Sequence, residues 1–253
     1  MQRREFLRTG LLLGATGTVP GVALAARQLS NDPPTITGLV LPPLNDSESL
    51  ALLIHAIRRE HFELVKSLVR QGINVHARNK CGETPLHIAA RHKSVEVVQH
   101  LILQGINVNV KDGRDSTPLL ESTRYFSGAD IVKCLVTHGA DVRARNDLGS
   151  TPLHHIARRR NTYGVLEYLV SHGAGVNAKN NEGRTPLHEA IHRFTNIDTL
   201  QYLLSHGADV SIRDDEGRTA LDYAMVYADD ENYPKQAERQ RMIIDLLRGV
   251  EVV

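Results

Sequence analysis

A short motif that returns at a fixed spacing constrains the fold of this chain more than any other feature. The tripeptide Thr-Pro-Leu, with one weaker copy Thr-Ala-Leu, begins at Thr84, Thr117, Thr151, Thr185 and Thr219. The steps between these threonines are 33, 34, 34 and 34 residues, and a series of glycines keeps the same spacing: Gly72, Gly105, Gly139, Gly173 and Gly207. A period of this length is typical of a stacked repeat array.

Each unit reads as two short helices followed by a polar loop. The threonine hydroxyl caps a helix N-terminus, and the proline fits the first helical position, where a missing N–H costs nothing. Apolar residues then recur at helical spacing, as in Leu86, Ala89 and Ala90, and the glycine supplies the left-handed residue that ends a second helix. Because two such helices bury too little to fold alone, neighbouring units must stack.

These motifs resemble the ankyrin repeat family. The matching segments are the Thr-Pro-Leu-His runs, the Gly-Ala-Asp-Val stretches 139–142 and 207–210, and Asn181-Glu182-Gly183-Arg184. The resemblance implies an all-α ankyrin-repeat solenoid of about six helix-turn-helix units with hairpin-like loops along one edge. It also implies a protein that binds other proteins, with no catalytic chemistry common to the family.

The predicted array covers residues 47–250 and departs from the pattern at both ends. Its first unit lacks the motif where the period places it, at Ala51, and Asp46 or Ser47 is expected to cap its first helix. The last unit contains an insertion around 229–234, after which Pro234 opens a helix expected to cap the array. The predicted units are about 47–79, 80–111, 112–145, 146–179, 180–213 and 214–250.

The N-terminal 25 residues have the pattern of a secretory signal. A basic start is followed by a short apolar run and by the small residues around Ala25, after which we expect cleavage. Arg3 and Arg4, followed by Glu5-Phe6-Leu7, resemble a twin-arginine signal. A proline-rich linker or arm is expected over 26–46. The remaining alternatives are an uncleaved membrane anchor and a start site placed too early. We expect an exported protein, most simply a bacterial periplasmic one.

Composition excludes a general affinity for nucleic acid. The formal charge is +1 for the whole chain and becomes −1 without residues 1–25, since three arginines and one glutamate leave. There is no basic excess to attract a polyanion. Nothing after the signal is long and apolar enough to span a membrane.

The chain has two cysteines. Cys134 is expected in the core and Cys81 on an exposed loop, and we expect no disulfide between them.

One segment matches a zinc-hydrolase pattern: His188-Glu189-Ala190-Ile191-His192 has two histidines one turn apart with a glutamate between them. The repeat register gives His188 a different explanation, because it is equivalent to His87 and His154. The resemblance implies that this histidine makes a hydrogen bond between repeats. With no third ligand in view, we expect no metal, no cofactor and no catalytic residue.

The candidate protein-binding residues lie seven and eight positions after each repeat start. They are Arg58, Arg91, Arg124, Tyr125, Arg158, Arg159, His192 and Arg193. Stacking would align them, and the resemblance implies that they face a binding surface. They could form a positive groove for an acidic protein surface. Alternatively, they only place cations at helix C-termini or pair with acidic residues of the following helices, Glu63, Glu96, Asp130 and Asp198. The two interpretations are compatible.

Loop tips form a second candidate surface, and their Asn, Asp and Gly residues are explained by turn chemistry. The exposed Leu148 needs no special explanation on sequence grounds. The function we predict is a non-catalytic protein-binding module outside the cytoplasm, such as an inhibitor, an immunity factor or an accessory subunit. The alternatives are a zinc-dependent hydrolase using His188, Glu189 and His192, and a structural or stress-protective protein without a dedicated partner.

Overall fold

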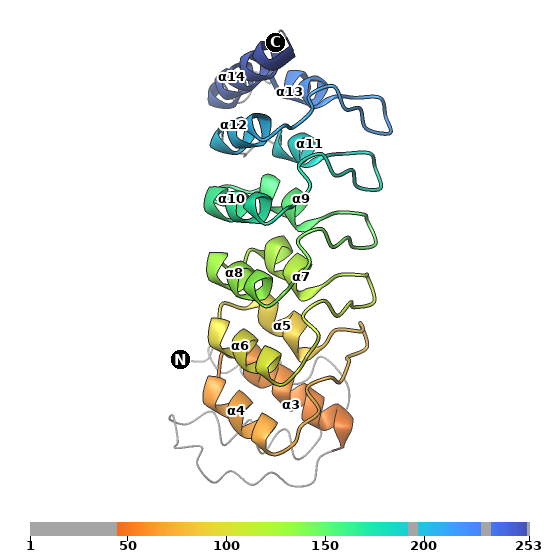
Figure 1. Cartoon of the computed structure of the whole chain (residues 1–253), viewed down its shortest axis with the longest axis vertical. Helices are drawn as coiled ribbons and strands as arrows, with labels where there is room; N and C mark the ends of the chain where they lie inside the picture. The colour runs from red at the N-terminus through yellow and green to blue at the C-terminus, as the bar shows by residue number, and fades with distance from the viewer. Residues whose placement is uncertain (1–44, 192–196, 229–233, 252–253) are drawn as a thin grey trace, which may run out of the picture.

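The chain forms an elongated stack of helical pairs (Figure 1). The structure is a computed structural model and describes residues 45–191, 197–228 and 234–251. All twelve regular elements within these residues are α-helices: α3 (Asp46–Arg58), α4 (Phe62–Arg70), α5 (Pro85–Arg91), α6 (Val95–Leu103), α7 (Pro118–Tyr125), α8 (Ala129–Thr137), α9 (Pro152–Ala157), α10 (Tyr163–Ser171), α11 (Pro186–Ala190), α12 (Ile197–Ser205), α13 (Ala220–Ala228) and α14 (Pro234–Glu251).

The helices lie in two rows, and long loops project from one side of the stack (Figure 1). The odd-numbered helices form an inner row next to the loops, and the even-numbered helices form an outer row. Each inner helix packs on the inner helix of the next unit, as α5 does on α7 and α7 on α9. The predicted all-α solenoid of helix-turn-helix units is confirmed.

The repeated motif builds the start of each inner helix and also joins adjacent units. Thr84 is the N-cap of α5 and Pro85 its first residue. Nδ1 of His87 accepts a hydrogen bond from the Thr84 backbone N–H at 3.1 Å, so Nε2 donates to the carbonyl of Ser116 in the next unit at 2.9 Å. His154 and His188 repeat this arrangement. The predicted role of this histidine between repeats is therefore confirmed.

The glycine series ends the outer helices. Gly139 has φ +87°, a left-handed conformation that an L side chain adopts only with strain, directly after α8 and its C-cap residue His138. The imidazole of His138 lies 2.7 Å from the Cys134 carbonyl, so its Nδ1–H can add a hydrogen bond to a carbonyl that already accepts the His138 backbone N–H at 3.2 Å. The turn to the loop is thus fixed by two consecutive residues.

The two ends of the stack differ from its middle. Helix α3 has 13 residues and begins at Asp46, where Asn45 is the N-cap and shares a capping box with Glu48. The prediction that Asp46 or Ser47 caps this helix was wrong, because the side chain of Asn45 accepts the Glu48 N–H. At the other end, α14 begins at the predicted Pro234 and packs mainly on α13.

A continuous apolar core runs along the stack. Leu86, Leu119, Leu153 and Leu187, which follow the motif prolines, are all buried in it. As predicted, Cys134 is buried and Cys81 is exposed. None of the helices in the described ranges combines the length and apolar character that a membrane crossing requires.

Several predictions fall on residues outside the described ranges. They are the signal with Arg3, Arg4 and Ala25, most of the linker at 26–46, the candidate residues His192 and Arg193, and most of the insertion at 229–234.

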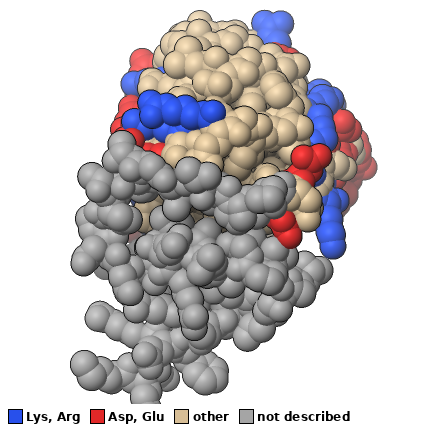
Figure 2. All heavy atoms as spheres, turned by 90° about the horizontal axis from the view of Figure 1, so that it is seen from below, with Lys and Arg blue, Asp and Glu red and all other residues tan. Residues whose placement is uncertain are grey.

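Seen from the N-terminal end, acidic and basic side chains lie close together along the sides of the stack (Figure 2).

Candidate functional site

Three neighbouring hollows lie between the inner helices and the projecting loops. The first, of about 490 Å³, includes Arg91 and Tyr125. The central one, of about 410 Å³, includes Arg124 and His155, and the last, of about 360 Å³, includes Tyr223. Arg124 lines both the first and the central hollow, and Arg158 lines the central and the last. The hollows therefore form one surface, called the groove below.

The loop wall of the groove is held by a repeated turn. Oδ1 of Asn146 accepts hydrogen bonds from the backbone N–H groups of Leu148 at 3.1 Å and Ser150 at 2.9 Å. The backbone N–H of Asn181 then donates to the Leu148 carbonyl at 3.0 Å and joins this loop to the next one. Asn79, Asp112, Asn180 and Asp214 make equivalent turns. These bonds hold the loops in fixed positions relative to one another.

The candidate basic residues lie at or near the ends of the inner helices, as predicted. Arg58 is the last residue of α3, Arg91 the last of α5, Arg124 the last but one of α7, and Arg158 the C-cap of α9. Arg91, Arg124, Arg158, Arg159 and Tyr125 line the three hollows, whereas Arg58 lines none of them.

Arg91 is held by carboxylates on both sides. Its guanidinium pairs with Glu83 in its own unit and, at 2.6 Å between Nε and Oε2, with Glu121 on α7. Glu121 is only 2% exposed and also accepts a hydrogen bond from the Ser116 hydroxyl at 2.9 Å. The alternative that Arg91 pairs with Glu96 of the following helix was wrong. Arg91 links two units rather than presenting a free charge.

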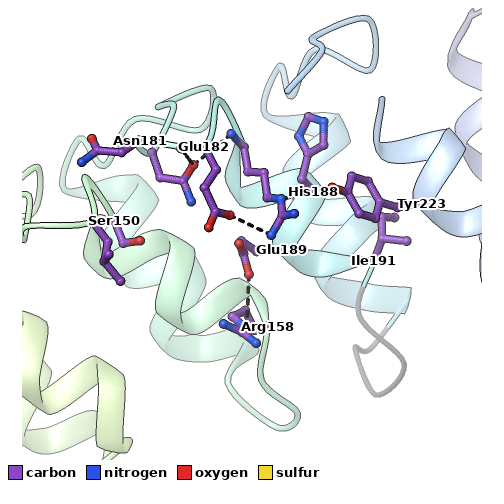
Figure 3. Close-up of a pocket in the computed structure, with 11 residues that line it drawn as sticks. Ser150, Arg158, Asn181, Glu182, His188, Glu189, Ile191 and Tyr223 are labelled. Atoms are coloured by element: carbon purple, nitrogen blue, oxygen red, sulfur yellow. Dashed lines mark hydrogen bonds and ion pairs between the residues drawn. The ribbon is translucent and has the colours of Figure 1, made fainter. Parts of the chain in front are cut away.

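Arg158 is paired more loosely. Its Nε lies 3.2 Å from Oε2 of Glu189 on α11, and its side chain is 54% exposed (Figure 3). Glu189 points toward Arg158, while the imidazole of His188 points away from it (Figure 3). Burial raises the pKa of Glu189, partly offset by the charge of Arg158. Arg158 therefore keeps donors available to a ligand.

The central hollow contains more positive than negative charge. Three arginines line it, Arg124, Arg158 and Arg159, and Glu189 is the only carboxylate among the described residues of its lining. Arg159 donates to the backbone carbonyl of Arg124. Burial, and then the charge of Arg158, lower the pKa of Arg159. Burial also lowers the pKa of His155 to about 4, with the Leu120 carbonyl opposing and the neighbouring arginines contributing, so this imidazole is neutral at pH 7.

Two large exposed side chains flank the central hollow. Tyr125 is 52% exposed at the end of α7, and Leu148 is 65% exposed at a loop tip. Sequence reasoning gave Leu148 no role, but it lines both the central and the last hollow. A signal was present: Leu148 is the large apolar residue at a loop position that reads Cys81, Arg114, Leu148, Glu182 and Glu216 along the array.

The last hollow contains Tyr223, which the sequence did not single out. The ring of Tyr223 lies near two guanidinium groups, with centroid distances of 5.3 Å to Arg184 and 4.4 Å to Arg218. Its hydroxyl donates to Asp214 at 2.6 Å. Arg184 also pairs with Glu182 at 2.8 Å. This end of the groove is well paired and close to neutral.

The segment that matched the zinc pattern is engaged in the fold. Nδ1 of His188 lies 3.2 Å from the Thr185 backbone N–H, and Nε2 lies 3.2 Å from the Arg218 carbonyl. Both ring nitrogens therefore have partners, and Glu189 pairs with Arg158. No group of three or more potential metal ligands occurs in the described part of the protein. His192 lies outside it.

Comparison with known proteins agrees with the repeat pattern. A family model described as ankyrin repeats (3 copies) matches residues 23–112 and 119–214. Among solved structures, one protein of the complex titled Bd0816 predatory endopeptidase from Bdellovibrio bacteriovorus with immunity protein Bd3460 is similar, with a TM-score of 0.65 and 25% sequence identity. The match covers 75% of this chain and 96% of that one. The search of curated proteins found no match.

Proposed function

This chain belongs to the ankyrin repeat family, and we propose that it acts without catalysis, by binding another protein in the groove. The observation that carries the proposal is the groove itself. It runs from the loop at Lys80 to Tyr223, has a wall of hydrogen-bonded loops and exposes Tyr125 and Leu148 beside arginines. Aromatic residues and arginines are enriched among the residues that dominate binding energy at protein interfaces.

The similar solved structure supports this kind of role. Its title names an immunity protein in complex with an endopeptidase, and nearly all of the matching protein is covered. We infer that this chain also acts on another protein, as an inhibitor, an immunity factor or an accessory subunit. Since 560 solved chains match, the fold alone does not select among these roles. The chemistry of the groove must do so.

We also propose that the protein works outside the cytoplasm. The proposal rests on the basic start with Arg3 and Arg4 and on the small residues before the expected cleavage after Ala25. Replacing both arginines by lysine should keep the protein in the cytoplasmic fraction with its signal attached, if export follows the twin-arginine route. Unchanged export of this variant would contradict the route.

A matched pair of surface variants tests binding in the groove. Leu148→Asp places a charge between the central and last hollows. Leu103→Asp is the control: it places the same charge on α6, at a residue that is 76% exposed and lines none of the hollows. Each immobilised full-length variant is exposed to an extract of the source cells, and retained proteins are identified and then purified for reconstitution.

The expected result is a purified partner that binds the wild type and Leu103→Asp alike but binds Leu148→Asp at least ten times more weakly. That ratio corresponds to about 1.4 kcal/mol. If Leu148→Asp binds the purified partner as the wild type does, the groove is not the binding surface.

A further inference from the structure

The repeat places one basic side chain of each unit opposite one position of the next. The basic residue stands seven positions after the motif threonine, and the facing residue stands four positions after the next threonine. The three facing pairs that line the groove are Arg91 with Glu121, Arg124 with His155, and Arg158 with Glu189. Two of the three pairs therefore join a cation to a carboxylate of the neighbouring unit, at 2.6 Å and 3.2 Å.

The middle pair has a cation but no carboxylate. Arg124 is exposed and has no ion pair within the described residues. His155, which faces it, is largely withdrawn into the fold, with Nδ1 3.2 Å from the Thr123 hydroxyl. An imidazole held neutral beside guanidinium groups cannot neutralise them. The centre of the groove thus keeps an unneutralised positive charge, whereas on either side a glutamate of the next unit neutralises the corresponding arginine.

Neighbouring contacts hold the donors of this centre in place. The guanidinium of Arg124 lies 5.8 Å from the ring centroid of Tyr125, and Arg159 donates to the Arg124 carbonyl. Arg158 lines the same hollow from the other side. Arginine offers a planar fork of N–H groups that matches the two oxygens of a carboxylate. These contacts restrict the side chains of Arg124 and Arg159, so binding a carboxylate costs less side-chain entropy than it would with unrestrained side chains.

We propose that the central hollow, between Arg124 and Arg158 and beside His155, binds a carboxylate of the partner protein in the place where the neighbouring pairs have Glu121 and Glu189. The proposal rests on the proposed function and names the chemistry of its main contact. The partner segment would be acidic at one position and apolar on its flanks, to meet the exposed Tyr125 and Leu148. The carboxylate belongs either to an Asp or Glu residue of the partner or to the partner's C-terminus.

The repeat itself supplies the sharpest variant. His155→Glu places in the middle pair the residue that the two neighbouring pairs already carry, so it should fold normally and occupy the hollow with an internal carboxylate. His155→Gln is the matched control, because it keeps a neutral polar side chain. Arg124→Gln removes the cation. Thermal unfolding checks that each variant is folded.

The probe is a library of ten-residue peptides in two forms, one amidated at the C-terminus and one with a free carboxylate, exposed to the immobilised full-length protein. We expect the bound peptides to be enriched in Asp or Glu at one position in the amidated form, or to bind only in the free form. These two results distinguish the carboxylate of an Asp or Glu residue from the terminal one. The enriched peptide should bind at least tenfold more weakly to His155→Glu and Arg124→Gln, and within about twofold of the wild type to His155→Gln.

Other outcomes would overturn the inference. The enriched peptides could bind without any carboxylate and fail to bind Leu148→Asp. That result would refute the carboxylate site and leave the groove as a binding surface. Acidic peptides that bind His155→Glu as well as the wild type would refute the site in the same way. An absence of any enriched peptide also counts against it, and the proposed function is then decided separately by the purified partner and Leu148→Asp.

Discussion

Arg91 and Arg124 occupy the same place in consecutive units and have different surroundings. Arg91 lies between Glu83 and Glu121 and is partly buried. Arg124 is exposed and faces the neutral imidazole of His155. The period fixes where each arginine stands on its helix. The residue that faces it from the next unit, however, decides whether it stabilises the stack or can bind a partner.

This difference changes how the basic series is interpreted. A uniform positive groove would require every arginine in it to be unpaired. Among the described residues that line the hollows, the central hollow has three arginines and one carboxylate, whereas the first has four cations and three carboxylates and the last has two of each. The two interpretations of the series, binding surface and local pairing, therefore apply to different members of it. Variants that reverse several arginines together would mix a loss of folding with a loss of binding.

The largest expected effect comes from reversing the charge of Arg91. Arg91→Glu would place three carboxylates together, one of them on the buried Glu121. We expect the free energy of unfolding to fall by about 3 kcal/mol, in the range for breaking a largely buried ion pair. Arg124→Glu should change it by less than about 1 kcal/mol, because that side chain is exposed.

Denaturant unfolding of both variants at pH 7 measures this contrast. Both changes remove a cation from a helix C-terminus, so the helix-dipole contribution largely cancels between them. Equal losses of stability would mean that Arg91 and Arg124 have the same structural role, contrary to the structure.

The next largest contrast is the one that acidification should produce between the wild type and a variant without His155. The pKa values of His154 and His155 are lowered to about 4, mainly by burial. A lowered pKa means that the folded state favours the neutral ring. The contribution of each ring to the free energy of unfolding is therefore complete above the unfolded pKa of about 6.5. It decreases as the pH falls from there and is lost once the pH has fallen through 4, by up to about 3 kcal/mol per histidine.

Unfolding at several pH values between 7 and 4.5 tests this dependence, with His155→Gln as the comparison. The variant lacks one titrating ring, so its stability should fall less than that of the wild type, by about 2 kcal/mol at pH 5. If the two curves are parallel, His155 is not held neutral in the groove.

Glu121→Gln should have a smaller effect than charge reversal at Arg91. The amide keeps the shape of the side chain but removes the charge that Arg91 and Ser116 contact. We expect a loss of about 2 kcal/mol, since Arg91 retains Glu83. Chemical unfolding at pH 7 provides the value. A loss no larger than that of an exposed substitution would show that Glu121 is not a structural partner.

The local part of the fold could be predicted from the sequence because each signal acts within a few residues. Thr84 caps a helix that Pro85 begins, and Gly139 ends one, so their spacing predicts the units directly. The electrostatics of the groove could not be predicted in this way. Arg91 and Glu121 are 30 residues apart and meet only through the stacking of two units.

The residues that the sequence did not single out occupy equivalent positions in successive units. Glu121, His155 and Glu189 each stand four positions after a motif threonine and so form one column of the repeat, and Leu148 belongs to another column. Reading the basic column alone predicted a series of similar cations. Reading it beside the column that faces it in the next unit would have separated the paired arginines from Arg124. The insertion and the arm give no such column, because they lie outside the period.

The smallest expected effect belongs to Glu189→Gln, which sharpens the contrast with Glu121. Burial raises the pKa of Glu189, and its partner Arg158 is more than half exposed. A raised pKa means that the stability linked to the protonated form is complete below about 4.5 and is lost as the pH rises through the folded value. Glutamine imitates the protonated form, so the variant should be as stable as the wild type at pH 7 or more stable by about 0.5 kcal/mol, since exposed pairs contribute little. The difference between the two unfolding free energies should shrink as the pH is lowered toward 4.5. If Glu189→Gln lowers the free energy of unfolding at pH 7 as much as Glu121→Gln does, the two carboxylates stabilise the stack equally. The difference between Arg124 and the other arginines would then come from its position in the array and not from the absence of a facing carboxylate.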